Sequence, residues 1–162
     1  MKKTLQITLV LAALFAVGSL RADESPADTR PHAKEGFATV YDKEGRLWVF
    51  RDGSPEHHAY LEDGIPTRYV TRPGVGPGGI TLRSPEGETI VEYVVAQPGF
   101  LTEIDKDGRL WVLRVGSPEH EAYLEKGKPA QQVIRPGAGP LGLTVKSVDL
   151  DTIDAYLEAV SG

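Results

Sequence analysis

The sequence predicts an α+β protein made of two tandem ββαββα units, with antiparallel sheets, packed as one body with pseudo-two-fold symmetry. The first observation is an internal repeat. Residues 36–97 recur at 99–160 in one register, 63 positions apart (99 − 36 = 63), and 35 of the 62 paired residues are identical. The second is the pattern inside each copy, where strand-like runs alternate with helix-start signals. The third is size, because a unit of about 60 residues buries too little surface to be comfortably stable alone.

The chain divides into four predicted segments: a signal peptide (1–22), a flexible N-terminal arm (23–35), and the two repeat units (36–97 and 99–162). Lys2 and Lys3 precede an apolar stretch, and small residues then lead to Ala22, which is the pattern of a secretory signal. The apolar stretch is shorter than the roughly 20 residues that span a bilayer. We therefore expect a periplasmic or secreted protein with no membrane span in the mature chain.

The charge and cysteine content narrow the function classes. Loss of the leader removes three positive charges and lowers the formal net charge from −5 to −8 (−5 − 3 = −8). An acidic chain is a poor generic partner for nucleic acid, whose binding depends on neutralising phosphates. The chain has no cysteine, so neither a disulfide nor a lipid-bearing cysteine is available.

Each unit opens with a predicted hairpin, followed by a helix, two short strands and a second helix. Glycine closes each hairpin turn, which is typical of a residue with positive φ. The second strand is apolar on both faces, so we expect helices of its own copy on one side and the partner copy on the other. The expected strands of the two units are 37–41, 46–51, 68–72 and 80–83, and then 100–104, 109–114, 131–135 and 143–146.

The helix boundaries carry their own signals. Ser54-Pro55-Glu56 and its copy Ser117-Pro118-Glu119 supply an N-cap, a proline in the first turn and an acid. Glycine stops this helix after about two turns. In the last helix Ile153, Tyr156, Leu157 and Val160 form an apolar stripe. The stripe predicts a helix that packs on its own sheet. We expect the helices to lie on one face of the sheet.

The most unusual segment of each unit is a Gly/Pro loop after an arginine. Glycines leave backbone N–H groups free to surround an anion, and an adjacent arginine adds positive charge. A rigid turn without a ligand explains the same pattern, and nucleotide-binding loops differ because they lead into a helix. The predicted ligand-binding residues of these loops are Arg72, Gly74 and Gly76, with Arg135, Gly137 and Gly139 in the second copy.

Trp48 and Trp111 complete the predicted ligand-binding set. Arginines flank both, so an aromatic and cationic surface for a sugar or a peptide is one interpretation. Core packing on a two-sided strand is the simpler one.

The histidines suggest an alternative function. His57 and His120 are equivalent, and His58 is adjacent to the first, so a two-fold arrangement would bring them together as a metal pair. A buried neutral histidine bonded to the backbone accounts for the pattern equally well. A hydrolase with a histidine general base is a second alternative, but the serines Ser54, Ser84, Ser117 and Ser147 all precede helix signals and read as caps. The acidic turn at 105–108 resembles the start of a calcium loop, yet position five is Arg109, which favours a hairpin.

From these features the sequence predicts a non-enzymatic binding or interaction module without a cofactor. Its partner is expected to be a small anion or another protein, and not nucleic acid. Retention of a residue in both copies does not discriminate among these alternatives, because a recent duplication retains every residue.

Overall fold

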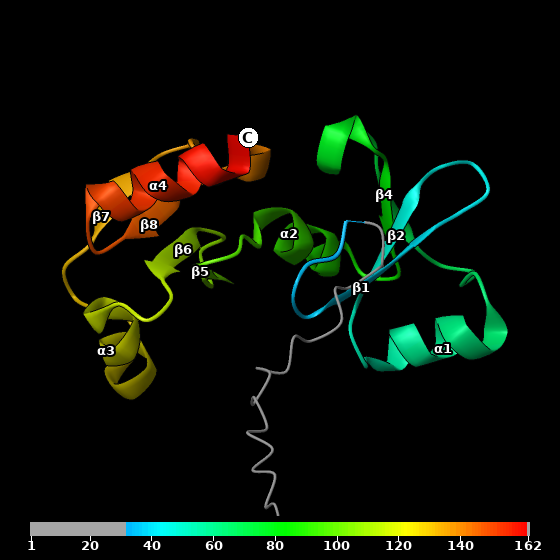
Figure 1. The fold of residues 1–162 in the computed structure, drawn as a ribbon, viewed down its shortest axis with the longest axis horizontal. Coiled ribbons are helices and arrows are strands. Elements are labelled where there is room, and N and C mark those ends of the chain that lie inside the picture. The colour runs from blue at the N-terminus through cyan, green and yellow to red at the C-terminus, as the bar shows by residue number, and fades with distance from the viewer. Residues whose placement is uncertain (1–31, 162) are drawn as a thin grey trace, which may run out of the picture.

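The computed structural model describes residues 32–161, so the predicted signal peptide and most of the predicted arm lie outside the described residues. The first repeat contains β1 (Phe37–Tyr41), β2 (Leu47–Arg51), α1 (Pro55–Asp63), β3 (Val70–Arg72), β4 (Leu82–Ser84) and α2 (Gly87–Val95). The second contains β5 (Phe100–Ile104), β6 (Leu110–Arg114), α3 (Pro118–Lys126), β7 (Val133–Arg135), β8 (Val145–Ser147) and α4 (Leu150–Ser161). The two tandem ββαββα units of an α+β fold are therefore confirmed (Figure 1).

Each repeat forms one four-stranded sheet, with the strand order β1-β2-β4-β3 in the first and β5-β6-β8-β7 in the second. The outer pairs are antiparallel, but β2 pairs with β4 in parallel, and β6 pairs with β8 in the same way. The prediction of wholly antiparallel sheets is corrected on this point. The reason is the helix α1 between β2 and β3, which returns the chain to the far edge of the sheet, so that β4 runs back alongside β2.

The two-sided central strand is buried on both faces, as its composition predicts. Leu47 and Val49 pack against the residues of α2, whereas Trp48 and Phe50 pack against Tyr60 of α1. Both covering helices belong to the same repeat, so each unit has three layers with the sheet in the middle. The expectations of helices on one face, and of a partner copy on the other, are corrected.

The two repeats share the helix α2, which is apolar on two sides. Ile90 and Tyr93 belong to the core of the first repeat. Val95 is buried in the core of the second repeat, and Val91 packs against that core. Because one helix contributes to both cores, the two units form one body.

The corresponding helix of the second repeat has no such second apolar side. Asp154 and Glu158 take the positions of Val91 and Val95, 63 residues further on, and both are exposed. The buried contact is therefore directional: α2 packs on the following repeat, and α4 presents acids where α2 presents valines. A polar face of this kind favours contact with solvent over packing on another unit.

An equivalent pair of tyrosines fastens the segment that precedes each repeat. The Tyr156 hydroxyl donates to the Val95 carbonyl at 2.8 Å, and the Tyr93 hydroxyl donates to the His32 carbonyl, 63 positions earlier, also at 2.8 Å. Burial raises the pKa of Tyr93 to about 12 and raises that of Tyr156 as well. Residues 32–35, at the end of the predicted arm, thus take the place in the first repeat that the end of α2 takes in the second.

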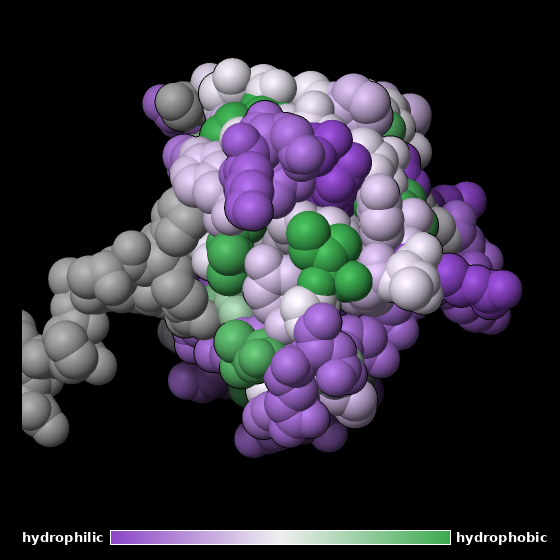
Figure 2. Space-filling model, turned by 90° about the vertical axis from the view of Figure 1, so that its right-hand side faces the viewer, coloured by the Kyte–Doolittle hydropathy of each residue, from purple (hydrophilic) through white to green (hydrophobic). Residues whose placement is uncertain are grey.

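The free end of the first repeat is mostly hydrophilic, with its apolar side chains in separate small groups (Figure 2). Scattered exposed apolar residues are ordinary on a protein surface. Among the described helices, none combines the length and the hydropathy that a membrane crossing needs.

Candidate functional site

The two Gly/Pro loops, one from each repeat, line a single cleft of about 830 Å³ between the repeats. Gly74 and Gly76 come from the first loop, and Gly139 and Leu141 come from the second. The C-terminal ends of α2 and α4 line the same cleft. Two segments that are 63 residues apart in the sequence therefore meet at one place.

The lining of this cleft mixes polar groups with apolar side chains, and Lys34 is the cation among its described residues. No aspartate or glutamate is among its lining residues. The Lys34 ammonium donates to the carbonyls of Tyr93 and Ala96 at 2.9 and 2.7 Å, and it lies over the Tyr93 ring. Burial lowers the pKa of Lys34. The cleft thus combines a half-buried positive charge with walls that are partly apolar.

The glycines have structural reasons to be there. A Cβ on Gly76 would lie 2.6 Å from a Leu82 methyl, and one on Gly139 would lie 2.7 Å from a Val145 methyl. These two residues therefore let the loops pack tightly on β4 and β8. Gly74 and Gly137 have φ of 70° and 65°, which L side chains rarely adopt.

The second loop departs from the first at Leu141, which replaces Gly78 and keeps φ at 57°. A leucine in this left-handed conformation is strained by roughly 1–2 kcal/mol. Its side chain is partly exposed and lines the cleft. Strain of this kind is retained where surrounding structure enforces it, and it marks a position worth testing for function.

The predicted arginines lie outside this cleft. Arg135 pairs with Asp154 of α4 at 2.7 Å, and Arg72 is exposed on β3. Neither of them, nor Gly137, is among the lining residues. The structure therefore brings together three of the six predicted loop residues: Gly74, Gly76 and Gly139.

The two tryptophans lie on the sheet face that α1 and α3 cover, and both are buried. The Arg83 guanidinium lies over the Trp48 ring, and the Lys146 ammonium lies 5.4 Å from the centre of the Trp111 ring. The indole N–H groups of both tryptophans are buried and have no hydrogen-bond acceptor among residues 32–161. The simpler interpretation of core packing accounts for the rings, but not for these two donors.

A carboxylate completes each of these clusters. Asp42 lies 3.4 Å from Arg83, and Asp105 lies 3.1 Å from Lys146, with both partners of the second pair almost fully buried. Burial alone would raise the pKa of Asp105, but the backbone N–H of Arg109 and the Lys146 ammonium bond to the charged form and hold its pKa below the usual value.

The same balance applies in the first repeat. Burial would raise the pKa of Asp42, but the backbone N–H and guanidinium of Arg46 lower it. Sequence analysis missed these ion pairs. The available signal was an aspartate at the start of each turn and a basic residue in β4 and β8, both retained in the two copies.

The histidines have structural partners of their own. The Nδ1 atom of His57 accepts from the Gly53 N–H at 3.2 Å, and that of His120 accepts from the Gly116 N–H at 3.1 Å. His57 also stacks on Phe50 of its own repeat. Because α1 and α3 lie at opposite ends of the molecule, the structure does not bring His57 and His120 together (Figure 1).

His58 is exposed. Over the part of the chain that the structure describes, no three or more His, Asp or Glu side chains are grouped as a metal site would need. The acidic turn at 105–108 is the predicted hairpin turn between β5 and β6, with Gly108 at φ 72°.

The serines are partly as predicted. Ser54 and Ser117 cap α1 and α3 by accepting from the backbone N–H groups of His57 and His120. Ser84 and Ser147 belong instead to β4 and β8, and the Ser147 hydroxyl donates to the Val112 carbonyl. Their predicted capping role is wrong, because the last helices begin three residues later and Asp149 supplies the bond at the start of α4.

Three comparisons with known proteins found no relative of this chain. No protein-family model matches the chain, no curated protein matches it in sequence, and no solved structure matches it.

Proposed function

We propose that this chain is an exported, non-enzymatic binding protein whose ligand occupies the cleft between the two repeats. The ligand class is a small anion with an apolar body. The observation that carries this proposal is the convergence of both Gly/Pro loops on one cleft of about 830 Å³. Ligand sites are typically concave and combine apolar walls with a few polar groups, and this cleft is concave and supplies both kinds of group.

The construction of the cleft supports a preformed site. Its two loops are held against their sheets by the close approach of Gly76 and Gly139, and its remaining wall comes from α2 and α4. A site whose walls are already rigid loses little entropy when a ligand binds. Neither repeat alone supplies all of the walls.

The charge of the cleft supports the anion. Lys34 is its cation, and no aspartate or glutamate is among the described residues that line it. An ammonium has three N–H donors, and two of them bond to the carbonyls of Tyr93 and Ala96. One donor remains for a ligand oxygen. The apolar part of the ligand would then contact Val75, Val94 and Leu141.

Titration of the protein with octanoate, followed by calorimetry and by thermal unfolding, tests the proposal. We expect octanoate to bind and to raise the melting temperature, because a ligand that binds only the folded state stabilises it. Octanol and octylamine have the same chain length without the anion, so they are expected to bind at least about tenfold more weakly. Lys34→Met should weaken octanoate binding by about tenfold to a hundredfold, since one charge-assisted hydrogen bond is worth about 1.5–3 kcal/mol.

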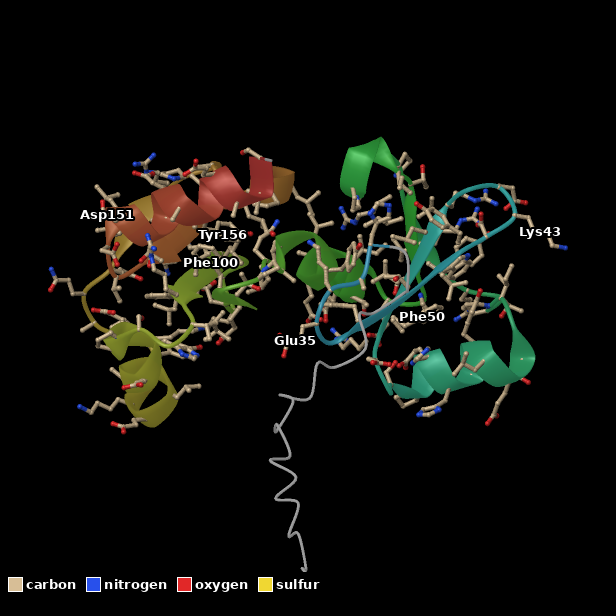
Figure 3. The ribbon with its side chains drawn as sticks, viewed as in Figure 1. Glu35, Lys43, Phe50, Phe100, Asp151 and Tyr156 are labelled. Atoms are coloured by element: carbon tan, nitrogen blue, oxygen red, sulfur yellow. The ribbon has the colours of Figure 1, made fainter. Side chains whose placement is uncertain are left out.

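Lys43→Met is the matched control. Lys43 lies in the exposed turn between β1 and β2, at the far end of the first repeat (Figure 3). This variant is expected to bind octanoate as the parent does. Equal binding of octanoate and octanol, or an unchanged affinity in Lys34→Met, would count against the anion. No binding of any of the three compounds would count against the cleft as the ligand site.

We also propose export to the periplasm or the cell exterior, from the leader-like residues 1–22. Bacterial cells that express the full chain should contain a mature form that begins near residue 23 in the periplasmic or culture fraction. Mass spectrometry of the purified protein measures this start. An uncleaved chain confined to the cytoplasm would contradict the proposal.

A further inference from the structure

A second cleft, of about 550 Å³, lies in the second repeat, on the sheet face that carries Trp111 and that α3 covers. Its buried lining residues are Asp105, Trp111 and Lys146, and its more exposed ones include Glu103, Lys128 and Gln132. It shares none of its lining residues with the cleft between the repeats. Its chemistry is therefore independent of the function proposed above.

The two repeats differ at this place in a concerted way. Val40, Ile65 and Tyr69 of the first repeat correspond to Glu103, Lys128 and Gln132 of the second, always 63 positions apart. In the first repeat, Tyr69 contacts the Trp48 ring at a centroid distance of 5.1 Å and lies 4.7 Å from the Arg83 guanidinium. The same frame of tryptophan, cation and aspartate is thus covered by an aromatic ring in one repeat and lined by polar residues in the other.

The polar residues form an organised network. Glu103 accepts from the Tyr123 hydroxyl and pairs with Lys128 at 2.8 Å. Beneath them, the Lys146 ammonium pairs with Asp105. A network of this kind holds donors and acceptors in fixed directions, which is what recognition of a small polar molecule requires.

One donor in the cleft has no acceptor. Trp111 is only 3 % exposed, and its indole N–H is buried without a hydrogen-bond partner among the described residues. A buried donor left in this state costs roughly 1–3 kcal/mol. The Trp48 indole N–H is buried in the same state, so this donor is shared by both repeats and does not by itself mark a ligand site.

The lining charges select the kind of molecule. Three acids (Glu103, Asp105, Asp107) are balanced by three lysines (Lys106, Lys128, Lys146), so the cleft has no net formal charge. A balanced set gives no preference for an anion or a cation. Hydroxyl groups suit it, because each one both donates to carboxylates and accepts from ammonium groups.

We propose that this cleft of the second repeat binds a small uncharged sugar, whose hydroxyl groups bond to the carboxylates and ammonium groups that lie beside Trp111. The volume is in the usual range for small-molecule sites. The first repeat does not bind sugar in this way, because Tyr69 covers the equivalent residues.

The indole signals in a proton–nitrogen correlation spectrum provide the test. The chain has two tryptophans, so there are two indole signals, and Trp48→Phe assigns them. We expect titration with glucose, galactose or N-acetylglucosamine to move the Trp111 signal in a saturable way and to leave the Trp48 signal in place. Acetate and glycine, an anion and a zwitterion, are expected to move neither.

Gln132→Tyr gives the second repeat the residue that the first has at Tyr69, and the new ring should cover the cleft. It is expected to weaken sugar binding by about tenfold or more, because the ring would occupy the space of the ligand. Gln131→Tyr, the same change at the neighbouring exposed position outside the cleft, is the control and should bind as the parent does.

Three results would overturn the inference. A Trp111 signal that no sugar moves would exclude the site. A signal that moves with acetate or glycine, but not with a sugar, would exclude the ligand class. A Gln132→Tyr variant that folds, as its spectrum shows, and keeps the parent affinity would place the sugar elsewhere. None of these results depends on whether octanoate binds between the repeats.

Discussion

Val95→Glu is expected to lower the free energy of unfolding by about 3 kcal/mol or more, from the lost burial of a valine and the burial of an unpaired charge. Val95 is 2 % exposed and belongs to the core of the second repeat although it lies on the last helix of the first. The substitution copies Glu158, which occupies the same position of α4. Urea denaturation followed by circular dichroism measures the change.

The same variant should also reduce the coupling between the repeats. If α2 no longer packs on the second core, the two units are expected to unfold in separate transitions in place of one. Val115→Glu is the matched control, since Val115 is 58 % exposed in the second repeat, and it should change stability by no more than about 0.5 kcal/mol. Equal effects of the two variants would contradict the shared role of α2.

Asp105→Ala is the second substitution with a large expected effect, a loss of roughly 3 to 5 kcal/mol in the free energy of unfolding. The variant leaves the Lys146 ammonium buried without its partner. It also removes the carboxylate that accepts from the backbone N–H groups of Asp107 and Arg109 in the turn. Urea denaturation at neutral pH is the measurement.

The stabilising effect of Asp105 should depend on pH. Its pKa is lower in the folded protein than in the unfolded chain, where the pKa of an aspartate is about 3.9. The contribution is therefore complete above about pH 5 and is lost as the pH falls below about 4 toward the folded pKa. The difference in unfolding free energy between the parent and Asp105→Ala is expected to shrink in that window.

Two further variants make the measurement specific. Asp107→Ala changes an exposed aspartate of the same turn and is expected to cost no more than about 0.5 kcal/mol. Asp105→Ala combined with Lys146→Met removes both charges and should recover part of the lost stability, because no ammonium then remains buried alone. A double variant as unstable as the sum of the single variants would argue that the ion pair is not the cause.

Local signals in the sequence predicted the elements well. The serine that caps α1 and α3, and the proline that begins each helix, start the helices through contacts with near neighbours. The glycines of the hairpin turns adopt the positive φ that was predicted. The stripe of Ile153, Tyr156, Leu157 and Val160 packs as one cluster. These features depend on neighbours within one or two turns of the chain, which is why a single sequence reveals them.

The candidate sites were only partly predictable. The Gly/Pro loops were recognised from composition, but their meeting in one cleft, and the absence of the two arginines from it, depend on how the repeats pack. Lys34 was assigned to a flexible arm, because its bonds to the end of α2 join residues that are about 60 positions apart.

The sequence by itself determined the duplication, the order of the elements and the burial of both faces of β2 and β6. Only the tertiary structure decided that β2 and β4 run parallel, that α2 serves two cores, and that Tyr69 covers in one repeat what Gln132 leaves accessible in the other. The physical reason is the separation along the chain of the residues that interact. Turns, caps and alternation arise from interactions between near neighbours, whereas pairing direction and shared cores arise from burial of surfaces that are distant in the chain.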